Sequence, residues 1–287
     1  MTYTLYLGDR SYSSWSLRAW LLREVWALPI DTIYVDFNGP GVAEQLADVA
    51  PARTVPTLKT PDGAIISESI AIAEELASRF PDAALWPTDP LLRATARSLA
   101  AEMHAGFVAL RTDCPMNLKA AYAGVVASDD VKTDLRRLET IWEQALDVSG
   151  GPWLCGAYSV ADAFFAPVAA RIAGYGLEVS KQASAYVGQH LSHLPFRQWR
   201  AMGLVQGVTL PWYRRDYRQV DWPGPAARSA RTVGSGPLVN ERCPYSGDPV
   251  TDFLEMEGQV YGFCNPFCRD KTVADPEAWP KFMALVP

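Results

Sequence analysis

The sequence has few histidines, few cysteines and no long apolar run. Its 287 residues include 3 His and 5 Cys, and five scattered cysteines are too few for the disulfide framework of a small secreted domain. A membrane-spanning helix needs about 20 predominantly apolar residues in succession, so we expect no membrane partner. The formal net charge of -6 argues against nucleic acid as the main partner.

The N-terminus also lacks the basic and apolar regions of a secretory signal, because MTYTLYLGDR starts directly in a strand pattern. We therefore expect a cytoplasmic protein. Hydrophobic residues make up 49% and charged residues 20% of the chain, as in soluble globular proteins. The length predicts about two domains, with a small appendage. Cys114 and Cys155 lie in apolar helical surroundings and are predicted to be buried small hydrophobes.

Residues 53–73, RTVPTLKTPDGAIISESIAIA, combine two strands and a helix. The pattern predicts strands over 55–59 and 64–67, and Asp62-Gly63 between two apolar runs is a strong hairpin signal. Pro56 has no N–H, which suits an edge strand or a special turn. A helix beginning at Ser69 would bring Glu68 and Ser69 to its opening turn, where free N–H groups attract an anion.

The residues before this stretch predict a strand over 2–7, a helix from Trp15, a strand over 31–37 and a short helix over 41–49. The resulting order over residues 1–81 is βαβαββα, which is that of a thioredoxin-like domain. The turn GDRSYSSWS leads into the first helix and is rich in serine, a residue that favours helix N-caps.

These residues resemble the glutathione-binding half of glutathione transferases, which has a thioredoxin-like fold. The resemblance implies a cis Val55-Pro56 bond and a role for Val55 and Pro56 in holding the cysteinyl part of glutathione. It implies that Glu68 and Ser69 hold the γ-glutamyl end. It also implies a homodimer and a small-molecule electrophile as the second substrate.

Three serines are candidates for stabilising the glutathione thiolate. The string RSYSSWSLR is similar to RSSCSWRVR of the zeta class, and alignment on Trp15 brings the catalytic serine of that class onto Ser11. The helix-start geometry instead favours Ser13 or Ser14, and Ser14 ranks third of the three. A helix N-terminus and a donating hydroxyl together could lower a thiol pKa from about 8.5 by roughly one to three units. Trp15 would line one wall of the electrophile pocket. Arg18 is expected to be a charged residue on the helix surface or between subunits.

An all-helical domain is predicted over 90–218. One long helix should run from Leu91 to an interruption at Cys114-Pro115, and a second should cover 129–148. Ser159 and Asp162 have the spacing of a capping box, which makes Asp162 structural. In the transferase family such helices form the second-substrate pocket, for which Phe107, Arg111 and Trp212 are loose candidates here.

Residues 219–236 are predicted to be a linker, and 237–287 a small cysteine-containing module. Cys243, Cys264 and Cys268 stand on a turn, at the end of a hairpin and on a helix start, which is the layout of a treble-clef zinc module. The segment resembles the metal-binding TRASH and YHS modules. Zinc in a structural site takes four ligands, and Ser246 stands where a second cysteine of the turn would be. The site is therefore one ligand short unless Asp248, Asp270 or water completes it. The alternative is a metal-free module held together by aromatic side chains.

The predicted fold class is therefore α+β multidomain: a thioredoxin-like domain, a helical-bundle domain and a treble-clef-like appendage. The predicted function is a glutathione-dependent transferase, which adds or exchanges the glutathione thiolate on a small electrophile, or a related isomerase or reductase. Glutathione would be the co-substrate, and zinc would bind the appendage. The alternative is a non-catalytic glutathione- or thiol-binding protein whose appendage binds metal or a partner.

Overall fold

A computed structural model of the chain describes residues 2–206 and 209–287. The chain forms two compact units. One contains the chain up to His190 together with Thr209–Pro223, and the other contains helix α9 (Leu194–Val205) and Gly224–Pro287. None of the described helices combines the length and the apolarity needed to cross a membrane.

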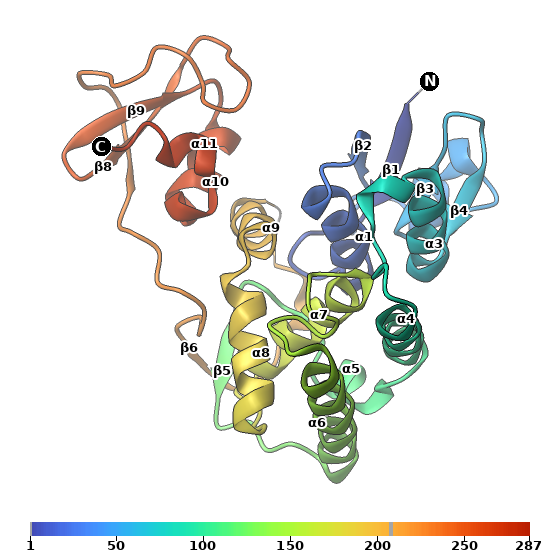
Figure 1. Ribbon diagram of the computed structural model, residues 1–287. Coiled ribbons are helices and arrows are strands. Elements are labelled where there is room, and N and C mark those ends of the chain that lie inside the picture. Colours follow the sequence, from blue (N-terminus) through green and yellow to red (C-terminus); the bar gives the residue numbers. More distant parts are fainter. Residues whose placement is uncertain (1, 207–208) are drawn as a thin grey trace. The chain divides into compact units, whose positions relative to one another are not determined.

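The first unit begins with a four-stranded mixed sheet and its helices (Figure 1). The elements are β1 (Tyr3–Leu7), α1 (Ser14–Val25), β2 (Ile30–Tyr34), α2 (Val42–Gln45), β3 (Thr57–Lys59), β4 (Ile65–Ser67) and α3 (Ser69–Arg79). The strand order is β2-β1-β3-β4, with β1 parallel to β2 and the other two pairs antiparallel. This arrangement confirms the predicted thioredoxin-like domain.

Local sequence signals explain how α1 begins and which residues it buries. Ser13 is its N-cap, and the Ser13 hydroxyl oxygen accepts a hydrogen bond from the Ser16 N–H at 3.3 Å. Leu17, Trp20 and Leu21 are buried at the predicted spacing of three and four residues. The helix packs against both α3 and α7 (Val160–Gly174), so its first turn is fixed between the sheet domain and the helical bundle.

The strands of the hairpin are shorter than predicted, since β3 starts at Thr57 and β4 at Ile65. The residue before Thr57 is Pro56, which has no N–H to donate to a ladder. The predicted helix start at Ser69 is correct.

The rest of the first unit is mainly helical. Its helices are α4 (Pro90–Ala105), α5 (Val108–Asp113), α6 (Asp129–Ser149), α7 and α8 (Lys181–Ser192). Helix α6 follows the prediction closely: Ser128 caps its start, and Gly150 ends it in the left-handed conformation at φ 75°. Almost every residue of α7 is buried, and α7 packs against α1 and α4, which makes it the central helix of the unit.

The predicted long helix from Leu91 is wrong, because the chain breaks it into α4 and α5 at Gly106 and Phe107. A Cβ atom at position 106 would lie 2.8 Å from the Glu102 carbonyl oxygen, so only glycine fits there. Phe107 has a φ of 56°, which is incompatible with a continuing helix. The break changes the direction of the chain ahead of Arg111.

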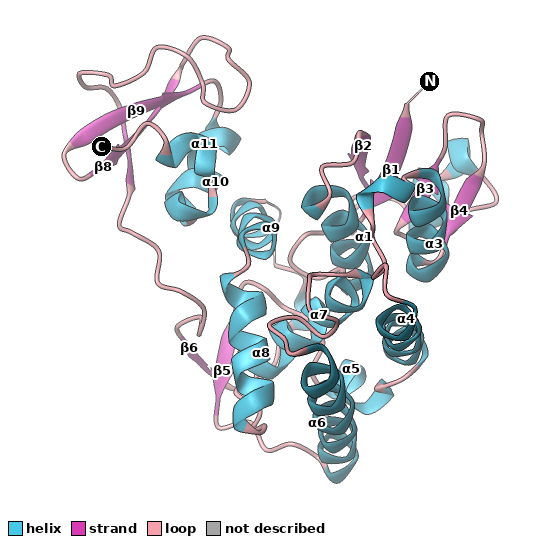
Figure 2. Ribbon diagram, viewed as in Figure 1, coloured by secondary structure: helices cyan, strands magenta, loops and turns pink. Residues whose placement is uncertain are grey.

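The second unit contains α9 (Leu194–Val205), β7 (Arg231–Val233), β8 (Asp252–Met256), β9 (Gln259–Phe263), α10 (Pro266–Ala274) and α11 (Pro280–Met283). Its three strands form one antiparallel sheet (Figure 2). The β8–β9 turn has positive φ values at Glu257 and Gly258, as a two-residue hairpin requires. Helix α9 packs against α10, and the Arg197 guanidinium donates to the Asp275 carboxylate at 2.6 and 2.9 Å. The predicted division at 90–218 grouped α9 with the helical domain, whereas in the structure it packs with the C-terminal module.

The predicted linker over 219–236 is not free of secondary structure. Strand β6 (Arg218–Val220) pairs with β5 (Ala121–Ala123), and β7 pairs with β8. Each three-residue strand is stabilised by a partner far along the chain, and nothing in its own composition indicates that partner.

Candidate functional site

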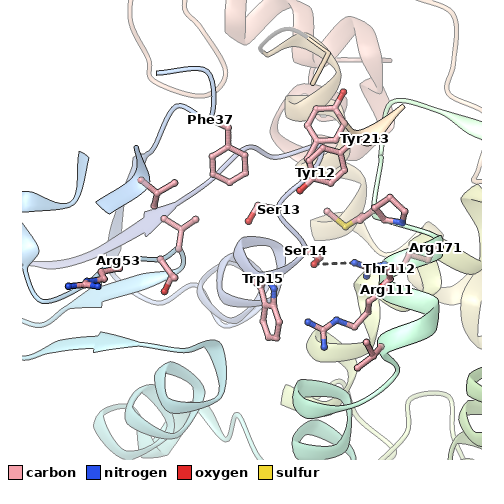
Figure 3. A pocket seen from close by; sticks show the side chains of 16 residues that line it. Tyr12, Ser13, Ser14, Trp15, Phe37, Arg53, Arg111, Thr112, Arg171 and Tyr213 are labelled. Carbon is pink, nitrogen blue, oxygen red and sulfur yellow. Dashed lines mark hydrogen bonds between the residues drawn. The ribbon is translucent and has the colours of Figure 1, made fainter. Parts of the chain in front are cut away.

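A cavity of about 490 Å³ lies in the first unit at the start of α1 (Figure 3). Its wall combines residues 12–15 at the start of α1, residues 53–55 before β3, and Phe37 and Val42. From the helical part come Arg111 of α5, Arg171 of α7 and Tyr213 of the 3-10 helix Pro211–Tyr213. The sheet domain and the helical bundle therefore both contribute to one cavity.

The hydroxyl groups of Ser13 and Ser14 both reach this cavity but have different partners. The Ser13 hydroxyl donates to the Ser16 hydroxyl oxygen at 2.8 Å, so its only proton is already used within the cap. The Ser14 hydroxyl oxygen accepts a hydrogen bond from Nη2 of Arg171 at 3.2 Å (Figure 3). Because Ser14 is an acceptor in that contact, its own proton remains available for a further acceptor.

Ser11 lies just before these residues but does not line the cavity. It is 1% exposed, its N–H donates to the Asp9 carboxylate at 2.7 Å, and its carbonyl oxygen accepts from the Leu118 N–H at 3.0 Å. Its backbone thus ties the turn before α1 to the helical part of the unit.

The predicted glutathione-binding residues lie on two segments. Val55 lines the cavity, and the Val55-Pro56 peptide bond is cis. Pro56, Glu68 and Ser69 are not among the residues that line it. Ser69 is the first residue of α3 and is fully buried, and its hydroxyl oxygen has no hydrogen-bond partner among the described residues. Glu68 has a φ of 71°, a strained value for a residue with a side chain.

A histidine of the helical part stands beside this second segment. The His104 Nε2 atom lies 3.6 Å from the Glu68 carboxylate, and the His104 ring makes an edge contact with the Trp15 ring, with centroids 5.1 Å apart. Burial, and then the charge of Arg18, lowers the pKa of His104. His104 therefore sits between Glu68 and the cavity wall.

The prediction that Arg18 is a surface or inter-subunit charge is wrong. It is 1% exposed, and its guanidinium carbon lies 4.3 Å from the Trp15 ring centroid and 5.0 Å from that of Phe164. Helix α7 covers this side of α1 and removes Arg18 from solvent.

Of the three second-substrate candidates, only Arg111 lines the cavity. Phe107 and Trp212 do not, and Trp212 is 60% exposed. Sequence reasoning missed Arg171, which joins three elements: it donates to the carbonyls of Cys114 and Pro167 and to Ser14. A signal was present, because Arg171 is the one basic residue in the helix VADAFFAPVAARIAG, which is apolar apart from Arg171 and the capping residue Asp162.

Asp162 has the structural role that the sequence predicts. Its fully buried carboxylate accepts four hydrogen bonds at 2.9 to 3.0 Å, from the Leu154 N–H, the Ser159 N–H and hydroxyl, and the Tyr186 hydroxyl. These bonds fix the start of α7, which carries Arg171 to the cavity.

A second candidate site lies in the other unit, where Cys243, Cys264 and Cys268 come together. Their sulfur atoms all lie within 4.8 Å of one another, and those of Cys264 and Cys268 are 4.0 Å apart. The Ser246 hydroxyl donates to the Cys264 sulfur at 3.3 Å. Two backbone hydrogen bonds close the turn after Cys243: the Cys243 N–H donates to Asp248, and the Gly247 N–H donates to Cys243.

Cys114, Cys155, Cys243 and Cys268 differ in how readily they ionise. Burial raises the pKa of Cys114 to about 11 and that of Cys155 to about 12, so both behave as the predicted buried hydrophobes. Burial also raises the pKa of Cys268 to about 12. Burial opposes ionisation of Cys243 too, but backbone N–H groups, first that of Ser246, outweigh it and hold its pKa at about 7.

Comparisons with known proteins agree with this geometry. Residues 12–79 match the family model of the glutathione S-transferase N-terminal domain. A probable maleylacetoacetate isomerase of Caenorhabditis elegans is 34% identical over 141 residues, which are 46% of this chain and 65% of that protein. The match therefore spans less than two thirds of that relative.

Solved structures with the same fold include a glutathione transferase homologue from Burkholderia gl BGR1 with bound glutathione. It is 24% identical, with a TM-score of 0.53 over 70% of this chain and 97% of that one. Glutathione transferase Omega 3C from Trametes versicolor is 20% identical, with a TM-score of 0.54 over 70% of this chain and 88% of that one. Over about 70% of its length the chain thus has the fold of these glutathione transferases, and its residues 12–79 are similar to the glutathione S-transferase N-terminal domain.

Proposed function

We propose that this protein is a glutathione-dependent transferase that joins the glutathione sulfur to a small electrophile. The observation that carries the proposal is the cavity at the start of α1, which Ser13, Ser14 and Val55 all line, within a region that matches the transferase N-terminal domain. The relative named as a probable isomerase supports enzymatic use of this site. A homodimer remains a prediction from the resemblance, and a cytoplasmic location remains a prediction from the N-terminal sequence.

In this proposal Val55 and Pro56 hold the cysteinyl part of glutathione, and Glu68 and Ser69 hold its γ-glutamyl end. Two features of the α3 start support the second role. The buried Ser69 hydroxyl has no partner among the described residues, and an unpaired buried hydroxyl costs free energy that a ligand hydrogen bond would offset. The free N–H groups of the helix N-terminus would favour the α-carboxylate of the ligand.

Ser14 is the serine that we assign to the thiolate, in place of Ser11 or Ser13. The Ser13 proton is used in the bond to Ser16, and Ser11 does not line the cavity. The Ser14 oxygen accepts from Arg171, which directs the Ser14 proton toward another acceptor. A thiolate at the start of α1 would accept a hydrogen bond from the Ser14 hydroxyl and would also be stabilised by the field of the helix N-terminus.

The chemistry requires only a stabilised thiolate. The thiol of glutathione loses its proton to solvent, and the sulfur lone pair forms a bond to an electrophilic carbon. In substitution the leaving group departs with its bonding electrons. When the thiolate instead adds to a conjugated alkene, the π electrons of the alkene move onto the activating group, which then takes a proton from solvent. Reversal of that addition after bond rotation would isomerise the alkene and regenerate the thiolate, so the same site serves both reactions.

The proposal predicts turnover of 1-chloro-2,4-dinitrobenzene or of a conjugated enone with glutathione, together with retention of the protein on immobilised glutathione. The alternative, a non-catalytic thiol-binding protein, predicts retention without turnover of either electrophile. Absence of both retention and turnover would contradict both functions.

Replacing Glu68 with alanine should weaken glutathione binding at least about tenfold, because the side chain that orients the γ-glutamyl end is lost. The side chain of Glu68 is 63% exposed, so the fold should tolerate the change. Glu74→Ala on the same helix is the matched control: its 45% exposed carboxylate pairs with Arg97 outside the cavity. Titration calorimetry that gives equal affinity for Glu68→Ala and the unmodified protein would reject the assignment.

We also propose that the C-terminal module is a treble-clef-like metal site. Tetrahedral zinc with thiolate ligands at about 2.3 Å brings its sulfur atoms to about 3.8 Å apart, and the sulfur atoms of Cys264 and Cys268 are 4.0 Å apart. The donor set therefore fits Zn²⁺ or a softer ion. A water molecule would complete the set, and a bound ion would cross-link the Cys243 turn to the start of α10.

Protein purified without chelator is expected to contain about one equivalent of zinc or of a softer metal per chain. Cys243→Ser should lower this content several-fold, because two thiolates remain. Cys114→Ala, which removes a buried thiol outside the cluster, should leave it unchanged. Elemental analysis is the measurement. A content below about a tenth of an equivalent, with the three thiols freely titratable in the folded protein, would mean that the module needs no ion.

A further inference from the structure

Ser16, in the first turn of α1, is a buried serine close to the cavity. It is 0% exposed and is not among the residues that line the cavity. Ser13 and Ser14 do line it (Figure 3). Buried polar atoms of side chains almost always have hydrogen-bond partners, so the partners of Ser16 indicate what its hydroxyl does.

The Ser16 hydroxyl oxygen accepts two hydrogen bonds. One comes from the N–H of Gly8, the residue after β1, and the other comes from the Ser13 hydroxyl, both at 2.8 Å. A hydroxyl oxygen has two acceptor lone pairs, so both acceptor positions of Ser16 are occupied. The Ser16 N–H in turn donates to the Ser13 hydroxyl oxygen at 3.3 Å. Ser16 therefore holds both the proton and the oxygen of the Ser13 hydroxyl.

The backbone around Ser13 is fixed as well. Its N–H donates to the Asp9 carbonyl oxygen at 2.9 Å, and its carbonyl oxygen accepts from the Leu17 N–H at 3.0 Å. The Asp9 carboxylate accepts from the N–H groups of Ser11 and Tyr12 at 2.7 and 3.2 Å. Because the turn is bonded on both sides, the single proton of the Ser13 hydroxyl stays within the helix cap.

Ser14 lines the same cavity, but its proton is not held in this way. Its hydroxyl oxygen accepts from Nη2 of Arg171 at 3.2 Å, and no hydrogen bond among the described residues uses its proton. Two serine hydroxyls thus reach one cavity, and only one of them is able to donate into it. The number of donors matters, because each hydrogen bond to a thiolate lowers its pKa and, with the pKa, its nucleophilicity.

We propose that Ser16 is a positioning residue that sets the reactivity of the glutathione sulfur, by holding the Ser13 proton so that Ser14 alone donates to the thiolate. A second donor would ionise the thiol more completely, but it would also make the thiolate a weaker nucleophile. With one donor the thiol is ionised and the sulfur keeps more of its reactivity. The inference rests on the proposed function, since it concerns the sulfur that is placed at Ser14.

Removal of the Ser16 hydroxyl should release the Ser13 proton to the sulfur. In Ser16→Ala the thiol pKa of bound glutathione should therefore lie about half a unit to one unit below that of the unmodified protein. At a pH above both pKa values, turnover of 1-chloro-2,4-dinitrobenzene should be about two- to threefold slower, because the thiolate is less nucleophilic. Thiolate absorbance against pH and the pH profile of turnover measure the two effects. A purely structural role would slow turnover without lowering the thiol pKa.

The double variant Ser13→Ala/Ser16→Ala is the main control, because it lacks the hydroxyl that Ser16→Ala releases. Its thiol pKa should return to that of the unmodified protein. Ser78→Ala removes an exposed hydroxyl that bonds within α3, and it should leave the thiol pKa unchanged. Ser13→Ala alone keeps the acceptor for the Gly8 N–H, and its thiol pKa should stay within about 0.3 units of the unmodified value.

An unchanged or raised thiol pKa in Ser16→Ala would overturn the inference, and so would an equal fall in Ser13→Ala/Ser16→Ala. If Ser16→Ala does not fold because the Gly8 N–H has lost its acceptor, Ser13→Ala still decides. A rise of about one unit there would mean that Ser13 already donates to the sulfur and that Ser16 does not hold its proton. Absence of glutathione binding by the unmodified protein would instead contradict the proposed function.

Discussion

Replacing Ser14 with alanine should raise the pKa of the thiol of bound glutathione by at least about one unit. A hydrogen bond to a charged acceptor contributes about 1.5–3 kcal/mol, and one pKa unit corresponds to about 1.4 kcal/mol. Below the new pKa the thiolate fraction falls, so turnover near pH 6.5 should drop about tenfold or more. The difference in turnover between Ser14→Ala and the unmodified protein should shrink as the pH rises through the raised thiol pKa, because the thiol of bound glutathione then ionises in both proteins.

The thiolate absorbance of the glutathione complex against pH measures this shift directly. Ser13→Ala is the informative control, because it removes the N-cap of α1 and should cost about 0.5–2 kcal/mol of stability with a smaller change in the thiol pKa. Ser14→Thr keeps the hydroxyl and should hold the thiol pKa close to that of the unmodified protein. A normal titration in Ser14→Ala, combined with a raised pKa in Ser11→Ala or Ser13→Ala, would show that we chose the wrong serine.

Asp162→Ala should lower the free energy of unfolding by about 3–5 kcal/mol. The change leaves donors from Leu154, Ser159 and Tyr186 without an acceptor in the interior, and each buried unsatisfied group costs about 1–3 kcal/mol. The start of α7 also loses its capping box. Because α7 carries Arg171, activity should fall along with stability.

Urea denaturation measures the loss. Asp129→Ala is the matched control, since Asp129 also stands in the first turn of a long helix but its side chain is 98% exposed, and we expect little change there. A loss for Asp162→Ala no greater than that of the control would show that the four buried hydrogen bonds contribute nothing measurable to stability.

Several elements could be predicted because their signals lie within a few residues. Helix α6 starts after Ser128 and stops at Gly150, and the β8–β9 turn uses Glu257-Gly258. The capping box at Ser159 and Asp162 is of the same kind. In each case the residue that starts or ends the element either hydrogen-bonds to the backbone there or permits the backbone conformation that is needed. Such features are set by local sterics and hydrogen bonds.

The elements that were missed depend on partners distant in the chain. Strands β5 and β6 pair across about a hundred residues, and β7 is ordered by β8. Each is three residues long, too short to give a periodic pattern. The break at Gly106 was hidden for a different reason, because the apolar positions of α4 and α5 continue at helical spacing through it.

The amino-acid sequence by itself determined the thioredoxin-like order of the first domain, the serine-rich start of α1 and the three cysteines of the C-terminal module. Only the tertiary structure separated Ser13 from Ser14, because the contact between Ser14 and Arg171 joins residues 157 positions apart. It also decided that Arg18 is buried, since a helical pattern shows which residues share a face but not that α7 covers that face of α1. The charge at the cavity follows from this packing, because guanidinium groups from α1, α5 and α7 meet only after the three helices come together.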